Sequence, residues 1–313
     1  MLSATDMQCD SPLLELQDVS YWYGPSIPAL QSLSLALGAT QRVALLGANG
    51  CGKSTLLKLL AGLLFAQSGA YRAFGREITA PLLSGTPFGL YFRKAVGIVF
   101  QNPEAQLFNP TVEDEIAFGP AQLLESPALV RERVAAALQL FGLEGLALRP
   151  PFALSGGEKK KVALASVLVV EPEVLLLDEP TAGLDPRSSR TLVDLVLQVQ
   201  ANGTTVLTAT NDLHIVPEIA DRVLVFGEDR RILTVGTPEE ILRDRVTLRA
   251  ANLVHRHRHA HAEGWHEHEH EHPSILHEHR HEGGAEENRH SAGGPNTDGP
   301  VGGPPIQVRR DEA

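Results

Sequence analysis

The chain has 313 residues, 43% of them hydrophobic, and a formal net charge of −11 at pH 7. This length is enough for one large domain or two small ones, and the acidic balance argues against broad nucleic-acid binding. No apolar run looks long enough to span a bilayer, no signal peptide is visible, and two cysteines cannot build a disulfide framework, so we expect a protein of the reducing cytosol.

The histidines divide the chain. Twelve of the thirteen follow Val254, so we expect a folded domain over residues 1–254 and a different segment over residues 255–313. The folded part opens with residues 13–21 and 33–37, whose apolar and polar residues alternate as in half-buried strands. They predict an antiparallel β element ahead of an α/β core. The aromatic residues 21–23 lie between them, where one could stack on a nucleotide base; core packing is an equally good interpretation.

Residues 47–55 read Gly-Ala-Asn-Gly-Cys-Gly-Lys-Ser-Thr and match the phosphate-binding pattern G-x-x-x-x-G-K-[S/T]. A predicted buried strand, residues 42–46, precedes this loop, and an apolar helix, residues 56–64, follows it. Backbone N–H groups would face phosphate oxygens. Lys53 would reach the β- and γ-phosphates, and the Ser54 hydroxyl would bind Mg²⁺. The expected nucleotide-binding residues of the loop are Gly47, Asn49, Gly50, Cys51, Gly52, Lys53, Ser54 and Thr55.

A second buried strand, residues 95–100, ends at Gln101 and is followed by Asn-Pro. Doubly wound sheets keep ligand contacts at the carboxyl ends of their strands. Gln101 could therefore meet Mg²⁺ or an attacking water. Residues 126–141 have helical spacing, and residues 103–165 as a whole are predicted to form a mostly helical subdomain inserted between two core strands.

A second anion site is predicted at Leu-Ser-Gly-Gly-Glu, residues 154–158, which opens a helix over residues 159–170. Small residues and free N–H groups at a helix start bind anions. One triphosphate cannot easily reach this site and the phosphate loop within one compact domain, so we expect it to face a nucleotide held by another subunit. The lysines at 159–161 are interpreted as a solvated helix face rather than as a surface for an acidic partner.

An unbroken apolar run at residues 174–178 ends in a carboxylate and predicts a buried parallel strand. Asp178 could hold Mg²⁺ through water, and Glu179 could serve as the general base that polarises the attacking water. Two adjacent buried carboxylates are seldom structural, because their desolvation is costly without a cation. Further on, the pattern predicts a turn at 182–185, a helix from 186, a strand at 204–210 and a hairpin at 222–226 and 232–235.

These motifs, in this order over residues 13–250, resemble the nucleotide-binding subunit of an ABC transporter. The resemblance implies an α/β fold with a phosphate-loop core, an antiparallel β subdomain and an inserted helical subdomain. It also implies ATP hydrolysis that powers a membrane importer, with the chain peripheral on the cytoplasmic face of the cell membrane. By this correspondence Tyr23 stacks on adenine and Gln101 is the Q-loop residue. Glu179 is the catalytic base and Asp185 the D-loop aspartate.

The same resemblance implies a dimer of ATPase subunits, for which we expect two identical chains rather than two different ones. Each of two ATP molecules would lie between the phosphate loop of one subunit and the signature segment, residues 154–158, of the other. The signature residues expected to contact ATP are Ser155, Gly156, Gly157 and Glu158.

Residues 101–108 and 111–119 resemble the ATPases of energy-coupling-factor importers, and residues 154–163 look closest to their cobalt and nickel members. In such systems the segment after the Q-loop glutamine meets coupling helices of a transmembrane T component, and a separate membrane S component holds the metal ion. Cobalt or nickel import is therefore expected. Vitamin import, and a soluble metal-storing or metal-sensing nucleotide switch, are the alternatives.

One departure from the family concerns the end of the strand at 204–210. A histidine usually follows this strand and contacts the γ-phosphate, whereas this chain has Asn211. Asparagine can donate a hydrogen bond but cannot carry positive charge, so we expect Glu179 to support a hydrolysis that Asn211 slows. A neutral replacement by Asn211 is the alternative, and His214 could share a helix face with it. The expected catalytic residues are Glu179, Gln101 and Asn211, and the expected Mg²⁺ ligands are Ser54, Gln101 and Asp178.

After Val254, histidine alternates with mostly charged residues. Alternation puts imidazoles on one side of an extended chain, and neutral imidazole suits Ni²⁺, Co²⁺, Zn²⁺ and Cu²⁺. We expect this disordered tail, residues 255–313, to bind a transition metal; a merely soluble charged tail is the alternative. The candidate ligands are His255, His257, His259, His261, His266, His268, His270, His272, His277, His279 and His281.

Overall fold

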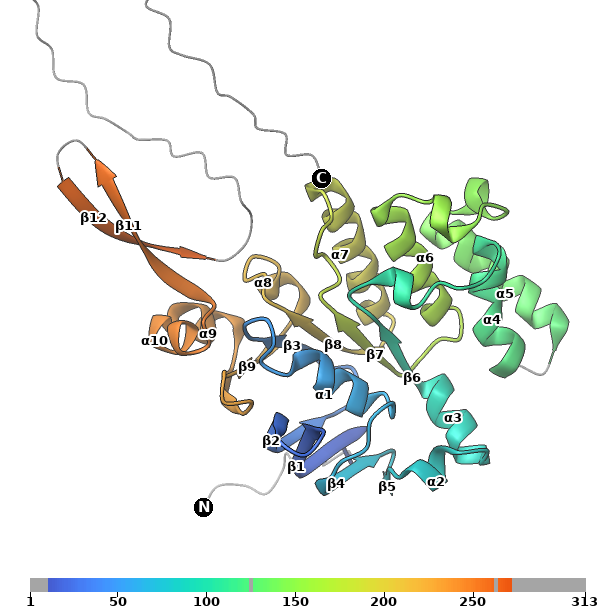
Figure 1. Cartoon of the computed structure of the whole chain (residues 1–313). Coiled ribbons are helices and arrows are strands. Elements are labelled where there is room, and N and C mark those ends of the chain that lie inside the picture. Colours follow the sequence, from blue (N-terminus) through green and yellow to red (C-terminus); the bar gives the residue numbers. More distant parts are fainter. Residues whose placement is uncertain (1–10, 124–125, 262–263, 272–313) are drawn as a thin grey trace, which may run out of the picture. The chain divides into compact units, whose positions relative to one another are not determined.

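The computed structural model describes residues 11–123, 126–261 and 264–271 (Figure 1). An antiparallel sheet contains the N-terminal strands in the order β2-β1-β4-β5. Its strands are β1 (Leu14–Tyr23), β2 (Ile27–Leu37), β4 (Ser68–Ala73) and β5 (Arg76–Glu77). Leu33, Leu35 and Leu37 are buried, because alternate residues of a strand share one face. The sequence predicted the first two strands but not β4 and β5.

A six-stranded sheet in the order β10-β9-β3-β8-β7-β6 forms the core. Its strands are β3 (Arg42–Leu46), β6 (Val96–Val99), β7 (Val174–Asp178), β8 (Thr205–Thr210), β9 (Arg222–Phe226) and β10 (Ile232–Gly236). All neighbouring pairs are parallel except β9 and β10. The carboxyl ends of β3, β6, β7 and β8 therefore meet at one edge, which carries the phosphate loop, Gln101, Glu179 and Asn211.

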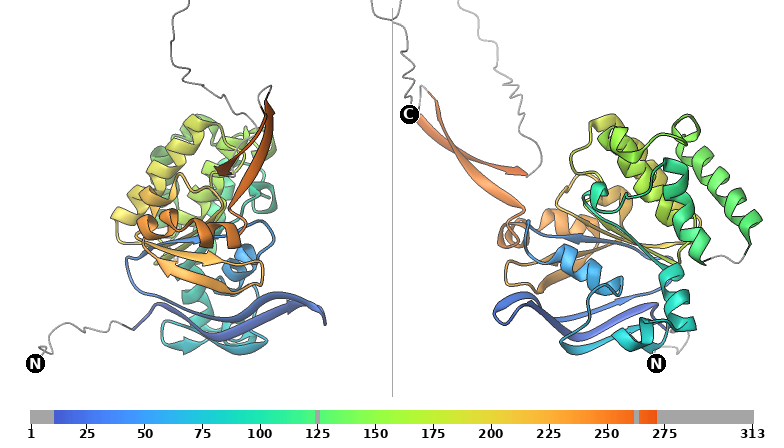
Figure 2. Two further views of the ribbon diagram at one scale, coloured as in Figure 1. Left: turned by 90° about the vertical axis from the view of Figure 1, so that its left-hand side faces the viewer. Right: turned by 45° about the vertical axis from the view of Figure 1, so that its right-hand side comes forward.

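Helices cover both faces of this sheet. Helix α1 (Lys53–Leu60) lies between the two sheets in Figure 1, and Leu56, Leu57 and Leu60 are buried there. The opposite face packs against α4 (Val112–Leu123), α5 (Pro127–Phe141), α6 (Gly156–Leu168) and α7 (Pro186–Ala201). Figure 2 shows these helices on the side of the core sheet away from the antiparallel sheet. The short helices are α2 (Ala80–Leu83), α3 (Pro87–Ala95), η1 (Pro103–Ala105), η2 (Glu144–Leu146), η3 (Pro151–Ala153), α8 (Val216–Ile219), α9 (Pro238–Arg243) and α10 (Arg245–Ala250).

Local capping explains where the longer helices begin. The Ser126 hydroxyl accepts the Leu129 N–H and starts α5, and Gly142, with φ +62°, ends it. Helix α6 begins at Gly156, three residues before the predicted start, because Ser155 and Glu158 form a capping box. None of the helices in the described ranges is long and apolar enough to cross a membrane.

The chain continues into a hairpin of β11 (Val254–His261) and β12 (Gly264–Glu271), where the sequence predicted no regular structure. The backbone register pairs histidine with histidine and arginine with glutamate: His255 with His270, Arg256 with Glu269, His257 with His268, Arg258 with Glu267 and His259 with His266. Residues 272–313, with His272, His277, His279 and His281, lie outside the described part of the chain.

Candidate functional site

A cavity of about 370 Å³ opens where the core strands end. It brings together Tyr23, the phosphate loop, Gln101 and Glu179, which come from four separate parts of the sequence. The lining residues are Tyr23, Ile27, Pro28, Ala29, Asn49, Gly50, Gly52, Lys53, Ser54, Thr55, Gln101, Glu179 and Arg230.

The glycines of the phosphate loop are dictated by its geometry. Gly52 has φ +120°, and a Cβ there would lie 2.4 Å from the Ala29 carbonyl oxygen. At Gly47 a Cβ would lie 2.7 Å from the Cys51 sulfur. Only glycine fits at these points. Burial raises the pKa of the Cys51 thiol, so Cys51 packs as a neutral side chain. The loop leads into α1, whose first N–H groups provide the donors that phosphate oxygens need.

Lys53 lies between the phosphate loop and the carboxylate of Glu179. Its ammonium donates to the carbonyl oxygens of Gly47 at 2.6 Å and Ala48 at 3.2 Å. It also lies 3.2 Å from Oε1 of Glu179, and both side chains are buried. The Lys53 ammonium is thus held where it can exchange the Glu179 carboxylate for a phosphate oxygen as its partner.

Glu179 follows β7 in a conformation unusual for a residue other than glycine, with φ +45°. Its backbone N–H donates to the Ala209 carbonyl at 2.8 Å. Its Oε2 accepts the backbone N–H of Asn211 at 3.3 Å. The end of the neighbouring strand β8 therefore orients this carboxylate toward the cavity.

Asp178 suits a divalent cation. The residue is buried, and its Oδ1 accepts no hydrogen bond among the described residues. Burial raises the pKa of the Asp178 carboxyl, and the neighbouring Ser54 hydroxyl and Lys53 ammonium oppose that rise. A buried oxygen without a donor, beside a hydroxyl, fits Mg²⁺, which prefers oxygen ligands and keeps several waters. Gln101 lines the same cavity.

Tyr23 lies at the edge of the cavity, with 42% of its surface exposed. Its hydroxyl is 3.4 Å from the Thr55 hydroxyl, and its ring meets Tyr21 edge-on at 5.1 Å. Tyr21 packs partly buried against the core. Of the three aromatics that the sequence left open, Tyr23 is thus placed for stacking and Tyr21 for packing.

Arg230 is a lining residue that the sequence did not indicate. It comes from the turn between β9 and β10, far along the chain, and donates to the carbonyl oxygens of Gly50, at 3.2 Å, and of Pro28. No motif marks this arginine. Only the position of β9 beside β3 brings it to the phosphate loop.

The signature residues and Asp185 do not line the cavity. Glu158 accepts hydrogen bonds from the Ser155 backbone at 2.8 Å and from its hydroxyl at 2.7 Å, which holds the pKa of the Glu158 carboxyl below its usual value. Asp185 caps α7, and hydrogen bonds from Ser188 lower its pKa. Within one chain these residues form a separate surface.

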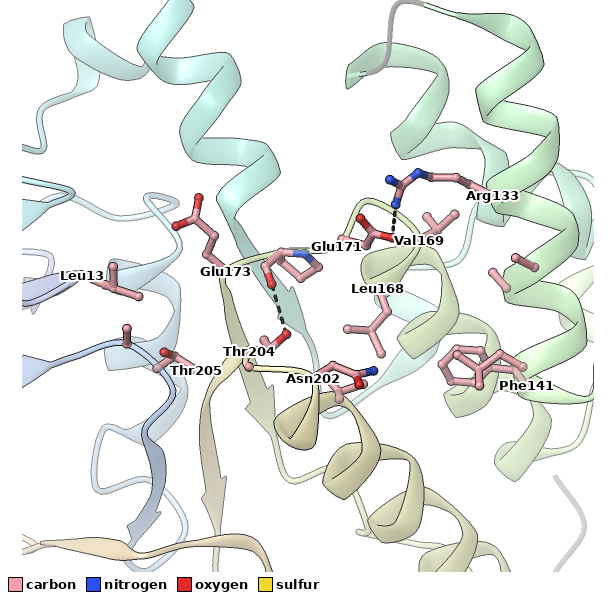
Figure 3. A pocket seen from close by; sticks show the side chains of 17 residues that line it. Leu13, Arg133, Phe141, Leu168, Val169, Glu171, Glu173, Asn202, Thr204 and Thr205 are labelled. Atoms are coloured by element: carbon pink, nitrogen blue, oxygen red, sulfur yellow. Dashed lines mark hydrogen bonds and ion pairs between the residues drawn. The ribbon is translucent and has the colours of Figure 1, made fainter.

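A second cavity, of about 570 Å³, lies at the opposite end of β7 and β8 (Figure 3). Thr204 and Thr205 line it at the start of β8, and an ion pair between Arg133 and Glu171 lies beside it. It shares no lining residue with the first cavity and contains none of the residues predicted for nucleotide binding. Among the side chains that the structure describes, no group of three or more His, Cys, Asp or Glu could hold a metal ion.

Known proteins with similar sequences include ATP-binding proteins of transporters, in agreement with the phosphate loop of the first cavity. The family described as ABC transporter matches residues 30–182. The nickel import ATP-binding protein NikO of Rhodobacter capsulatus is 48% identical over 78% of this chain and 96% of its own length. The energy-coupling factor transporter ATP-binding protein EcfA of Methanothermobacter thermautotrophicus is 40% identical over 77% of this chain and 76% of its own length.

A solved structure extends this similarity to the fold. The structure of cbiO1 from Clostridium perfringens, described as part of the ABC transporter complex cbiONQ, has a TM-score of 0.66 and 36% identity. It covers 77% of this chain, which in turn covers 95% of it. The chain therefore belongs to the ABC transporter family, as an ATP-binding subunit with ATPase activity.

Proposed function

We propose that this chain is the ATP-hydrolysing subunit of a membrane importer for nickel or cobalt ions, bound to the cytoplasmic face of the membrane. The observation that carries the proposal is the cavity in which Lys53, Ser54, Gln101 and Glu179 meet. The similarity to a nickel import protein supports the cargo.

The predicted site residues have separate parts in the proposed reaction. The phosphate loop and Lys53 bind the β- and γ-phosphates, and Glu179 takes the proton of the attacking water. The Asn211 N–H keeps the Glu179 carboxylate in place. Ser54, Asp178 and Gln101 would hold Mg²⁺, which neutralises phosphate charge.

The position of the signature segment supports a dimer. Ser155 and Gly156 are exposed, outside the cavity that holds the phosphate loop. A helix start that offers N–H groups to an anion needs a phosphate from elsewhere. We propose that two copies of this chain face each other, so that each signature segment meets the ATP bound by the other copy.

Asn211→His is expected to raise kcat for ATP about tenfold, because a histidine adds a charged donor at the end of β8. Asn211→Ala is expected to lower kcat. Steady-state ATP turnover measures both. His214→Asn is the matched control, since His214 is exposed and, of the two residues, it is Asn211 that donates its backbone N–H to Glu179. Unchanged turnover in Asn211→Ala would show that this side chain has no role.

An exposed aromatic pair follows the Q-loop and is proposed to dock on the membrane component. Phe108 and Phe118 meet edge-on at 4.9 Å and are 67% and 43% exposed. Changing both to serine should weaken association with the membrane component about tenfold or more, while ATP binding stays unchanged. Co-purification from membranes measures the loss. Val246→Ser, at another exposed apolar site, is the control, and equal recovery of the Phe108/Phe118 variant would refute the assignment.

The C-terminal histidines are proposed to bind cargo metal. Truncation after Val254 should abolish Ni²⁺ and Co²⁺ binding, measured by equilibrium dialysis, and leave ATP turnover within about twofold. Val254 itself is buried in the core and is kept. A full-length variant with asparagine at the tail histidines separates loss of imidazole from loss of chain. Turnover that responds to metal only in the intact chain would instead indicate a metal sensor.

Transport by the whole complex tests the proposed function. The chain and its membrane partners would be co-expressed, purified and placed in lipid vesicles with ATP on the side of the ATPase. The expected result is ATP-dependent accumulation of radioactive Ni²⁺ or Co²⁺, absent with Glu179→Gln. Vitamin uptake without metal uptake would overturn the cargo and retain the ATPase.

A further inference from the structure

The lysine run at the start of α6 does not form the solvated face that the sequence predicted. Lys160 is buried, with 7% of its surface exposed. Its neighbour Lys159 pairs with Glu104 at 2.6 Å. A lysine seldom loses its water without specific partners, so the surroundings of Lys160 require an explanation.

The Lys160 ammonium contacts three backbone carbonyls of one loop. It donates to the carbonyl oxygens of Glu179 at 3.3 Å, Pro180 at 2.8 Å and Ala182 at 2.6 Å. An ammonium has three N–H donors, so each donor has one acceptor. This loop follows the last paired residue of β7, Asp178, and the Glu179 N–H still donates to Ala209 of β8, so Lys160 holds the loop from its other side.

The same loop carries the catalytic base. Glu179 has φ +45°, a conformation that its surroundings must maintain. Lys160 lies one helical turn after Gly156 of the signature segment. At Gly157 a Cβ would lie 3.1 Å from the Ser188 hydroxyl, so the helix start also lies close to α7. Helix α6 thus connects the signature surface to the backbone that positions Glu179.

We propose that Lys160 is a positioning residue, whose three hydrogen bonds hold the Glu179–Ala182 backbone against the signature helix. This inference rests on the proposed function, in which Glu179 is the base and the signature segment meets the ATP of the second copy. A displacement of the signature helix in one subunit then moves the base of that same subunit. The state of one ATP site thereby affects the catalytic base of the other.

Hydrogen exchange tests the structural part independently of catalysis. In the full-length Lys160→Met chain, amides of residues 179–185 should exchange about tenfold faster or more, while the phosphate loop is unchanged. Lys161→Met, one residue along the helix, is the control. Unchanged exchange at 179–185 would overturn the proposal, as would a general increase, which would indicate loss of fold.

Kinetics test the effect on the base. Lys160→Met should lower kcat about tenfold or more and leave KM for ATP within twofold. In the double variant Lys160→Met/Ser155→Ala, the loss in kcat should be smaller than the product of the losses in the two single variants. Both substitutions act through the same helix. Unchanged kcat, or fully multiplicative losses, would overturn the connection. If Glu179→Gln keeps turnover, the proposed role of Glu179 as the base fails, whereas the exchange result still decides the role of Lys160.

The pH dependence of kcat is a further test, because a lysine with a purely structural role would not alter it. Burial lowers the pKa of Lys160 to about 8, opposed by the charge of Glu179. The other side chains that surround it in a small cavity are apolar: Val99, Phe100, Pro103, Ala163, Leu164, Leu177, Pro180 and Leu192. A neutral amine leaves one carbonyl without a donor, so wild-type kcat should fall above about pH 8.

Unfolding does not explain this fall. The pKa of Lys160 is lower in the folded chain than in the unfolded chain. As pH rises from the folded pKa toward the unfolded one, the buried side chain loses its charge and the fold becomes more stable. The Lys160→Arg variant keeps its charge, so its kcat should not fall above pH 8. A profile identical to wild type in Lys160→Arg would refute the role of the proton.

Discussion

Glu179→Gln is expected to lower kcat for ATP by about 10²- to 10⁴-fold, the usual contribution of a general base. Glutamine has nearly the same shape and can still accept the Asn211 N–H, but it cannot take a proton from water. Its neutral amide also frees Lys53 from an ion pair of 3.2 Å. ATP should therefore bind at least as tightly as to the wild type.

The measurement is steady-state turnover together with equilibrium binding of a fluorescent ATP analogue. Glu173→Gln is the matched control, because Glu173 precedes the other end of β7 and accepts a hydrogen bond from Tyr91 at 2.8 Å. That variant should turn over ATP within about twofold of wild type. Turnover above a tenth of wild type in Glu179→Gln would remove Glu179 from the role of base.

Most of the first cavity's predicted residues could be expected to lie together because they follow contiguous patterns. The phosphate loop is one nine-residue motif, and residues 174–178 form an apolar run that coincides with β7. A parallel sheet then brings the carboxyl ends of its strands to one edge. Sequence order and this single rule of topology were enough to place Lys53, Gln101 and Glu179 together.

What the sequence could not predict depends on contacts between distant segments. Arg230 reaches the phosphate loop only because β9 lies beside β3. Lys160 is buried because the loop after β7 covers one side of α6, and a run of three lysines contains no sign of that loop. Strand β4, which reads Ser-Gly-Ala-Tyr-Arg-Ala, lacks clear alternation and forms through its pairing with β1. In each case the outcome depends on tertiary contacts that the local sequence does not show.

Lys53→Ala is expected to weaken ATP binding and lower kcat/KM by about 10²- to 10³-fold, because the phosphates lose their buried cation. It should also destabilise the fold by about 3 kcal/mol, since the Glu179 carboxylate is left buried without a counter-charge. Turnover, ATP binding and denaturant unfolding measure the three effects. Lys94→Ala, at an exposed lysine in the last turn of α3, is the control.

The double variant Lys53→Ala/Glu179→Gln separates the two roles of Lys53. Removing the carboxylate charge removes the reason for the instability, so this variant should recover most of the lost free energy of unfolding. ATP binding should not recover, because the phosphates still lack the ammonium. Full recovery of ATP binding would mean that Lys53 acts only by neutralising Glu179. Failure to recover stability would mean that Lys53 supports the fold through its bonds to Gly47 and Ala48 rather than through the ion pair.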